Sequence, residues 1–213
     1  MTISPVDFAS LLCSRLCHDL LSPIGALNNG LELLADERDP AMRERCMELL
    51  AESARTSANK LKFFRLAFGA AGGFGDAVDT REARAAVFGL LGEKRLQLNW
   101  LVEEDSLPKP AAKVLLNLAM IAGDALVRGG RLDIGAERSD AGALEIVLRG
   151  QGARVVLDPE LRQALTEGAT VTARSAAAHL VHAIVTEAGG SVQVNEPEPG
   201  MLLVGAMFPP GSG

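Results

Sequence analysis

The chain has 213 residues, enough for one large domain or two small ones. Hydrophobic residues make up 48% and charged residues 23%, as in ordinary globular proteins. The net charge of -6 at pH 7 argues against sequence-independent binding of nucleic acid, which needs a basic surface. The N-terminus does not resemble a signal peptide, and no apolar stretch is long enough to span a bilayer. We therefore expect a cytoplasmic protein that makes no membrane contact.

Residues 1–69 predict a helical hairpin. Between residues 6 and 35, apolar side chains recur every three or four positions, and Ser4-Pro5 is a typical helix start. A loop at residues 36–39 precedes Pro40, which opens a second amphipathic helix that reaches about residue 68. The apolar stripes are too wide for two antiparallel helices to bury alone. The simplest solution is a four-helix bundle in a homodimer; the alternative is that the second domain folds back over the hairpin.

The cysteines Cys13, Cys17 and Cys46 fall within these helical patterns. Buried, reduced thiols are the expected state of such residues in a cytoplasmic protein. Cys13 and Cys17 are four residues apart, but their surroundings offer no convincing further ligands, so no metal site is predicted.

The first predicted helix carries the candidate catalytic residues, His18 and Asp19. At about 100° per residue, His18 points nearly opposite the apolar stripe, and Asp19 can accept a hydrogen bond from the imidazole ring. Pro23 lacks the backbone N–H that would bond to the Asp19 carbonyl, which favours a kink just after His18. We expect a docking surface around His18, formed by Arg15, Leu21, Ser22, Ile24, Gly25 and Asn29.

The segment His18-Asp19-Leu20-Leu21-Ser22-Pro23 resembles the H-box of sensor histidine kinases, H-[ED]-x-x-[STN]-P, which lies on the first helix of their dimerisation and phosphotransfer hairpin. Most of residues 11–34 are still more similar to the ChpT-type bacterial histidine phosphotransferases. This resemblance implies that His18 is a phosphoacceptor.

The rest of the chain predicts a glycine-rich linker at residues 70–75 and an α/β sandwich at residues 76–213, with helices on one face of a mixed sheet. Helices are expected at residues 80–91, 110–127, 158–165 and 175–188. Strands are expected at residues 95–102, 132–137, 144–148, 190–194 and 201–207, with a hairpin turn at residues 139–142. This order resembles the ATP-binding domain of histidine kinases, the Bergerat fold.

The same resemblance predicts that nucleotide binding has been lost. Residues 117–130 align with the N-box of the kinases, but Ile121 stands where their magnesium-binding asparagine would be, and isoleucine offers no oxygen ligand. The segment at residues 149–153 lacks the aspartate that accepts from adenine. The expected phosphate lid, residues 169–178, contains no glycine. We therefore expect no bound nucleotide, cofactor or metal.

The remaining histidines, His179 and His182, lie three residues apart at the margin of a predicted buried stripe. A metal pair or a second phosphate site is the sharper hypothesis. A solvated or helix-capping role is favoured, because no carboxylate or cysteine lies in helical register with them.

Together these patterns predict a phosphotransferase in a two-component phosphorelay. His18 would accept a phosphoryl group from a receiver-domain aspartate and pass it to the aspartate of a response regulator, with Mg²⁺ supplied by the receiver. The resemblance implies a CckA-type hybrid kinase as donor and CtrA-type and CpdR-type regulators as acceptors. The alternatives are a non-catalytic dimeric adaptor and an active histidine kinase fragment.

Overall fold

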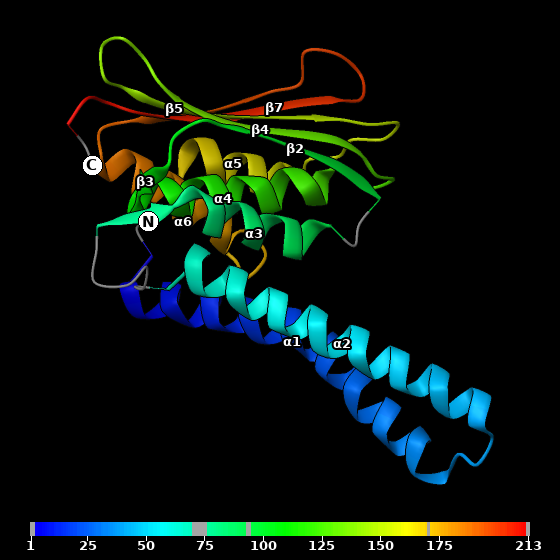
Figure 1. Cartoon of the computed structure of the whole chain (residues 1–213). Helices are drawn as coiled ribbons and strands as arrows, with labels where there is room; N and C mark the ends of the chain where they lie inside the picture. Colours follow the sequence, from blue (N-terminus) through cyan, green and yellow to red (C-terminus); the bar gives the residue numbers. More distant parts are fainter. Residues whose placement is uncertain (1–2, 70–75, 93–94, 170, 212–213) are drawn as a thin grey trace.

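The computed structural model describes residues 3–69, 76–92, 95–169 and 171–211. A long helical hairpin extends from one side of an α/β part, as Figure 1 shows. The linker predicted at residues 70–75 lies outside the described residues. Of the helices that the structure describes, none is both long and apolar enough to cross a membrane.

The hairpin consists of α1 (Pro5–Asp36) and α2 (Pro40–Ala67). The side chain of Ser4 caps α1 by accepting from the backbone N–H of Asp7, as the sequence predicted. The helices approach closely at Gly30, where an added Cβ would lie 2.9 Å from a methyl carbon of Leu50. Gly30 therefore fixes the spacing of the seam between α1 and α2.

The α/β part contains a mixed sheet with the strand order β2-β4-β5-β7-β6. Strands β2 and β4 are parallel, and the other neighbouring pairs are antiparallel. The strands are β2 (Leu96–Val102), β4 (Gly130–Arg138), β5 (Leu144–Gln151), β6 (Ser191–Asn195) and β7 (Met201–Phe208). The predicted hairpin turn joins β4 to β5, with Gly142 at a φ of 83°.

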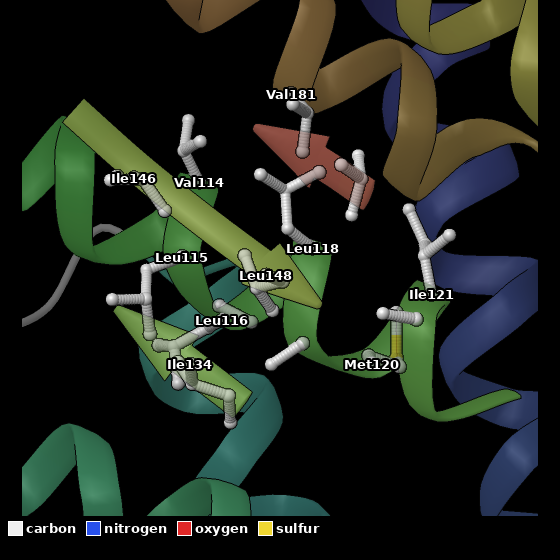
Figure 2. Close-up of a cluster of buried hydrophobic side chains, with 14 of the residues drawn as sticks. Val114, Leu115, Leu116, Leu118, Met120, Ile121, Ile134, Ile146, Leu148 and Val181 are labelled. Carbon is white, nitrogen blue, oxygen red and sulfur yellow. The ribbon is translucent and has the colours of Figure 1, made fainter. Parts of the chain in front are cut away.

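The helices of the α/β part cover one face of this sheet (Figure 1). They are α3 (Thr80–Leu91), α4 (Lys109–Ala125), α5 (Pro159–Glu167) and α6 (Ala176–Glu187). Helix α4 runs through the middle of the core. Figure 2 shows Leu115 and Leu118 of α4 beside Ile134, Ile146 and Leu148 of the sheet, all of them fully buried. The prediction of a helical hairpin followed by an α/β sheet domain is confirmed.

Two short strands were not predicted from the sequence: β1 (Ala77–Asp79) and β3 (Ser106–Pro108). They pair antiparallel beside the main sheet. The residue just before β3 also positions the start of α3, because the N–H of Thr80 donates to the carbonyl of Asp105.

The outer face of the sheet carries a buried charged residue, Asp133 of β4. Burial favours the neutral form of this carboxyl, but hydrogen bonds from Arg131, Asn99 and Arg149 outweigh burial and lower the pKa of Asp133 below its ordinary value. Through these bonds, the ionised carboxylate links strands β2, β4 and β5.

The α/β part covers one end of the hairpin. Helix α2 packs against α3 and α4, and α1 packs against α6. Leu16 and Leu20 of α1 lie against the buried core that α2 and the α/β part share. The ring of Phe8 meets that of His179 edge to face with centroids 5.2 Å apart. At this end of the hairpin, the structure therefore agrees with the predicted alternative, in which the second domain folds back on the hairpin.

Farther along the hairpin, apolar side chains remain exposed in the chain by itself. They are Leu21, Ile24, Leu31, Leu33, Met42, Met47, Leu49 and Leu61. The prediction of buried cysteines is correct for Cys46 and wrong for Cys13 and Cys17, which are exposed. Helical periodicity marked the apolar positions of α1, but their number exceeds what one neighbouring helix covers.

Candidate functional site

The candidate site centres on His18, on the part of α1 that lies beside the α/β part. Leu16 and Leu20 turn toward the core, and helical geometry turns the intervening His18 outward. Its side chain is 87% exposed. The imidazole is therefore accessible to a macromolecular partner while its backbone is held in a long helix.

The Asp19 carboxylate lies between His18 and Arg15. One oxygen, Oδ1, lies 3.4 Å from Nδ1 of His18, and the other, Oδ2, accepts from Nε of Arg15 at 3.2 Å. With each oxygen facing a different neighbour, the carboxylate is held in one orientation. This arrangement favours the tautomer of His18 that carries its proton on Nδ1 and leaves Nε2 free.

The backbone of Asp19 has a partner that the sequence analysis missed. Pro23 cannot donate to the Asp19 carbonyl, and the ammonium group of Lys60 on α2 does so instead, with Nζ 2.7 Å from the oxygen. Pro23 itself is buried, so its side chain has a packing role that the sequence did not reveal. The sequence signalled an unsatisfied carbonyl, but not which residue would satisfy it.

Arg15 links this turn of α1 to the α/β part. Its NH1 donates to the carbonyl of Arg174 at 2.8 Å, and its NH2 lies 4.0 Å from Oδ2 of Asp124. The Arg15 side chain is only 17% exposed. The sequence analysis placed Arg15 on a docking surface, whereas in the structure its guanidinium group is directed into the contact between the two parts of the chain.

A pocket of about 560 Å³ opens where the two parts meet, and His18 lies on its border. Its wall on the α1 side is polar, and its wall on the α/β side combines apolar residues with charged ones. The lining residues are Ser14, Arg15, His18, Asp19, Ile121, Asp124, Ala125, Val156, Leu157, Asp158, Leu161, Ala173 and Arg174.

The N-box positions are used for packing. Ile121, which aligns with the magnesium-binding asparagine of the kinases, is buried and contributes an apolar surface to the pocket. Asn117 is fully buried, and its side-chain amide donates to the carbonyls of Ala67 and Lys113. Asn117 thereby ties α4 to the end of α2 rather than presenting its amide to a ligand.

The described part of the predicted lid, residues 171–178, begins as a closed turn. The hydroxyl of Ser175 accepts from the backbone N–H of Thr172, and the hydroxyl of Thr172 accepts from the backbone N–H groups of Arg174 and Ser175. Thr172 also donates to Glu160, and the guanidinium group of Arg174 pairs with Asp158 at 2.9 Å. These bonds engage the backbone N–H groups of Thr172, Arg174 and Ser175, and they attach the turn to the start of α5.

The other predicted docking residues divide between two faces of α1. Ser22, Gly25 and Asn29 lie on the His18 side, and Ser22 and Asn29 are exposed. Leu21 and Ile24 are also exposed, but Ile24 lies about 120° around the helix from His18. Their role in docking remains a prediction.

His179 and His182 do not come together as a metal site. His182 Nδ1 lies 3.0 Å from the carbonyl of Leu165, near the C-terminal end of α5, where it caps the helix. Burial, and then the neighbouring His182, lowers the pKa of His179. Within the part of the chain that the structure describes, no three His, Cys, Asp or Glu side chains form a group that could hold a metal ion.

Comparisons with known proteins agree with this architecture. Residues 80–200 match the family of the histidine phosphotransferase C-terminal domain. The chain is 34% identical to the protein phosphotransferase ChpT of Brucella abortus (strain 2308) over 198 residues, which cover 92% of this chain and 93% of that protein. A solved bacterial phosphotransferase is similar with a TM-score of 0.84 and 32% identity, covering 97% of this chain and 98% of that one.

Full-length ShkA, solved in complex with AMPPNP, shares the fold at a TM-score of 0.50 and 20% identity, over 97% of this chain and 46% of ShkA. The family match and the two phosphotransferase relatives define the class of this chain, a protein phosphotransferase. The same comparisons identify the family within this class: the chain belongs to the ChpT-type histidine phosphotransferases.

Proposed function

We propose that His18 is the relay residue of a phosphorelay, receiving a phosphoryl group from a receiver-domain aspartate and passing it to the aspartate of a response regulator. The observation that carries this proposal is the exposed imidazole of His18 beside the oriented Asp19 carboxylate. A side chain that is 87% exposed on a rigid helix can enter the active site of another protein without rearrangement of its own chain.

The chemistry follows from the orientation of the ring. With its proton on Nδ1 facing Asp19, neutral His18 attacks the phosphorus atom through the Nε2 lone pair. The P–N bond forms as the bond between phosphorus and the donor's aspartate oxygen breaks, and that aspartate leaves as a carboxylate. The Asp19 carboxylate stabilises the positive charge that develops on the ring. Transfer to the acceptor aspartate is the same step in reverse.

We further propose that Mg²⁺ comes from the partner receiver and that ATP does not load His18. The receiver's ion neutralises charge on the transferred phosphoryl group. On this chain, Ile121 offers no oxygen ligand at the N-box position. The polar groups of the lid turn bond within the turn and to the start of α5. By resemblance, the donor is the receiver of a CckA-type hybrid kinase, and the acceptors are CtrA-type and CpdR-type response regulators.

The hairpin also supports the proposal of a homodimer. Around α1, Cys13, Cys17, Ile24 and Leu31 fall within about 40° of one another, all exposed. Around α2, exposed Met47, Ala54, Ala58 and Leu61 form a similar strip.

Both strips are displaced by about 80° in the same rotational sense from the seam between the helices. In an antiparallel pair this places them on the same side of the hairpin. A second copy covering that side would complete a four-helix bundle. His18 lies about 120° from the middle of the α1 strip, so it would stay accessible.

Two labelling reactions test the relay proposal. The protein is incubated with labelled ATP and Mg²⁺, and separately with a receiver domain carrying labelled phosphate. The expected result is label from the receiver alone, abolished in His18→Ala and retained in His179→Ala when each is compared per folded molecule. Label from ATP would identify a kinase, and label from neither source would identify a non-catalytic adaptor.

A further inference from the structure

Lys60 supplies a hydrogen bond that Pro23 cannot make. In a regular helix the N–H of residue 23 would donate to the carbonyl of Asp19, four residues earlier. Proline has no N–H, and Nζ of Lys60 lies 2.7 Å from that carbonyl oxygen. The bond crosses from α2 to α1 and spans 41 positions in the sequence.

We propose that Lys60 is a positioning residue for phosphotransfer: it replaces the helical hydrogen bond lost at Pro23 and so fixes the backbone that carries His18 and Asp19. This inference rests on the proposed relay function of His18. Lys60 acts through the Asp19 carbonyl and has no contact with the phosphoryl group in this role.

The local geometry explains why this bond affects the reacting atoms. The carbonyl that Lys60 holds belongs to Asp19 itself, so its direction is coupled to the backbone torsions from which the Asp19 side chain projects. The Asp19 carboxylate in turn faces Nδ1 of His18. Movement of this peptide group therefore shifts the carboxylate relative to the imidazole ring.

The surroundings of the Asp19 carbonyl make lysine a better hydrogen-bond donor there than water. Lys60 is half-buried, and its hydrogen bond to Asp19 is partly buried. A charged donor makes a shorter and stronger hydrogen bond than a neutral one, and its long side chain is anchored on the neighbouring helix. Water would satisfy the carbonyl but would not tie its direction to α2. The bond thus converts a break in the hydrogen bonding of α1 into a fixed link across the hairpin.

A double-mutant cycle between Lys60 and Pro23 tests this mechanism. Alanine at position 23 restores an N–H that can donate to Asp19. Lys60→Met should therefore slow transfer in the wild-type chain and have little effect in the Pro23→Ala chain. Lys60→Arg keeps a cationic donor and should retain more activity than Lys60→Met. Lys62→Met, at an exposed position two residues along α2, is the matched control.

The assay is single-turnover transfer from a phosphorylated receiver, measured across receiver concentrations. Lys60→Met is expected to lower the maximal rate by about 10-fold to 100-fold, the scale of loss when a reacting group is misplaced. The receiver concentration giving half the maximal rate should change little, because His18 remains exposed for docking. Circular dichroism of each variant confirms that equal amounts of folded protein are compared.

Two results would overturn the inference and differ from failure of the relay itself. An equal loss of rate from Lys60→Met with and without Pro23→Ala would show that Lys60 does not act through the Asp19 carbonyl. An unchanged maximal rate in Lys60→Met would show that the bond does not position the site. By contrast, a wild-type chain that takes no label from the receiver would overturn the proposed function, and the positioning role with it.

Discussion

Replacing Arg15 by methionine should weaken the attachment of the hairpin to the α/β part. Methionine keeps an unbranched apolar stem but removes the guanidinium group. The change deletes the 2.8 Å bond to the Arg174 carbonyl and the 3.2 Å bond to the Asp19 carboxylate. It also removes the positive charge that lies 4.0 Å from Asp124. The Arg15 side chain is only 17% exposed and its bond to Asp19 is partly buried, whereas its bond to the Arg174 carbonyl is exposed, so water can replace part of that bond.

The size of the effect follows from these two bonds. A hydrogen bond from a charged donor contributes about 1.5–3 kcal/mol to the free energy of unfolding. An ion pair between residues four apart on a helix adds about 0.3–0.5 kcal/mol. Because the bond to Arg174 is exposed, its contribution lies at the low end of that range or below it. We therefore expect Arg15→Met to cost about 1–3 kcal/mol, a considerable part of the 5–15 kcal/mol typical of a folded protein.

Urea unfolding followed by circular dichroism measures this loss. All variants are compared at one protein concentration, because a dimer would make the apparent stability depend on concentration. Arg55→Met removes an exposed arginine of α2 and should change the free energy of unfolding by no more than about 0.5 kcal/mol. If Arg15→Met fell within the same limit, the bonds between α1 and the α/β part would not hold the two together.

Three further results are expected. Asn117→Ala should lower the free energy of unfolding by about 1–3 kcal/mol, measured by urea unfolding, because it leaves the buried Ala67 carbonyl without its donor. Asp133→Asn should destabilise the protein at pH 7, and this deficit should shrink as the pH falls below about 3.9, since the lowered pKa of Asp133 stabilises the fold only while the carboxyl is ionised. Leu31→Glu should yield a monomer in sedimentation experiments while His18 stays competent to accept phosphate; an unaltered dimer would refute the proposed interface.

The sequence predicted the longer elements well because hydrophobic periodicity follows directly from burial on one face. Helix α3 has the predicted bounds, and α1 extends one residue beyond each end of its prediction. Strands β1 and β3 were missed because three residues are too few to display a period. Their pairing depends on segments 29 positions apart in the sequence, which a local pattern does not contain.

In the candidate site, too, local features could be predicted from the sequence and contacts between distant segments could not. His18 and Asp19 are neighbours in the chain, so their pairing could be predicted from helical geometry. The partners of this pair are distant: Lys60 lies 41 positions from Asp19, and Arg174 lies 159 positions from Arg15. The exposed Cys13 and Cys17 were misassigned for a related reason, since an apolar stripe reports that a surface favours burial but not which neighbour covers it.

The proposed loss of nucleotide binding and the observed contacts between the two parts of the chain are physically consistent. A domain that delivers phosphate from its own ATP must approach the histidine and then withdraw so that a receiver reaches the same nitrogen. Here Arg15 and Asn117 hold the α/β part against the hairpin through bonds to backbone carbonyls. Such an arrangement leaves His18 exposed without any domain movement. It suits the role proposed for His18, in which phosphate is exchanged only with partners arriving from outside the chain.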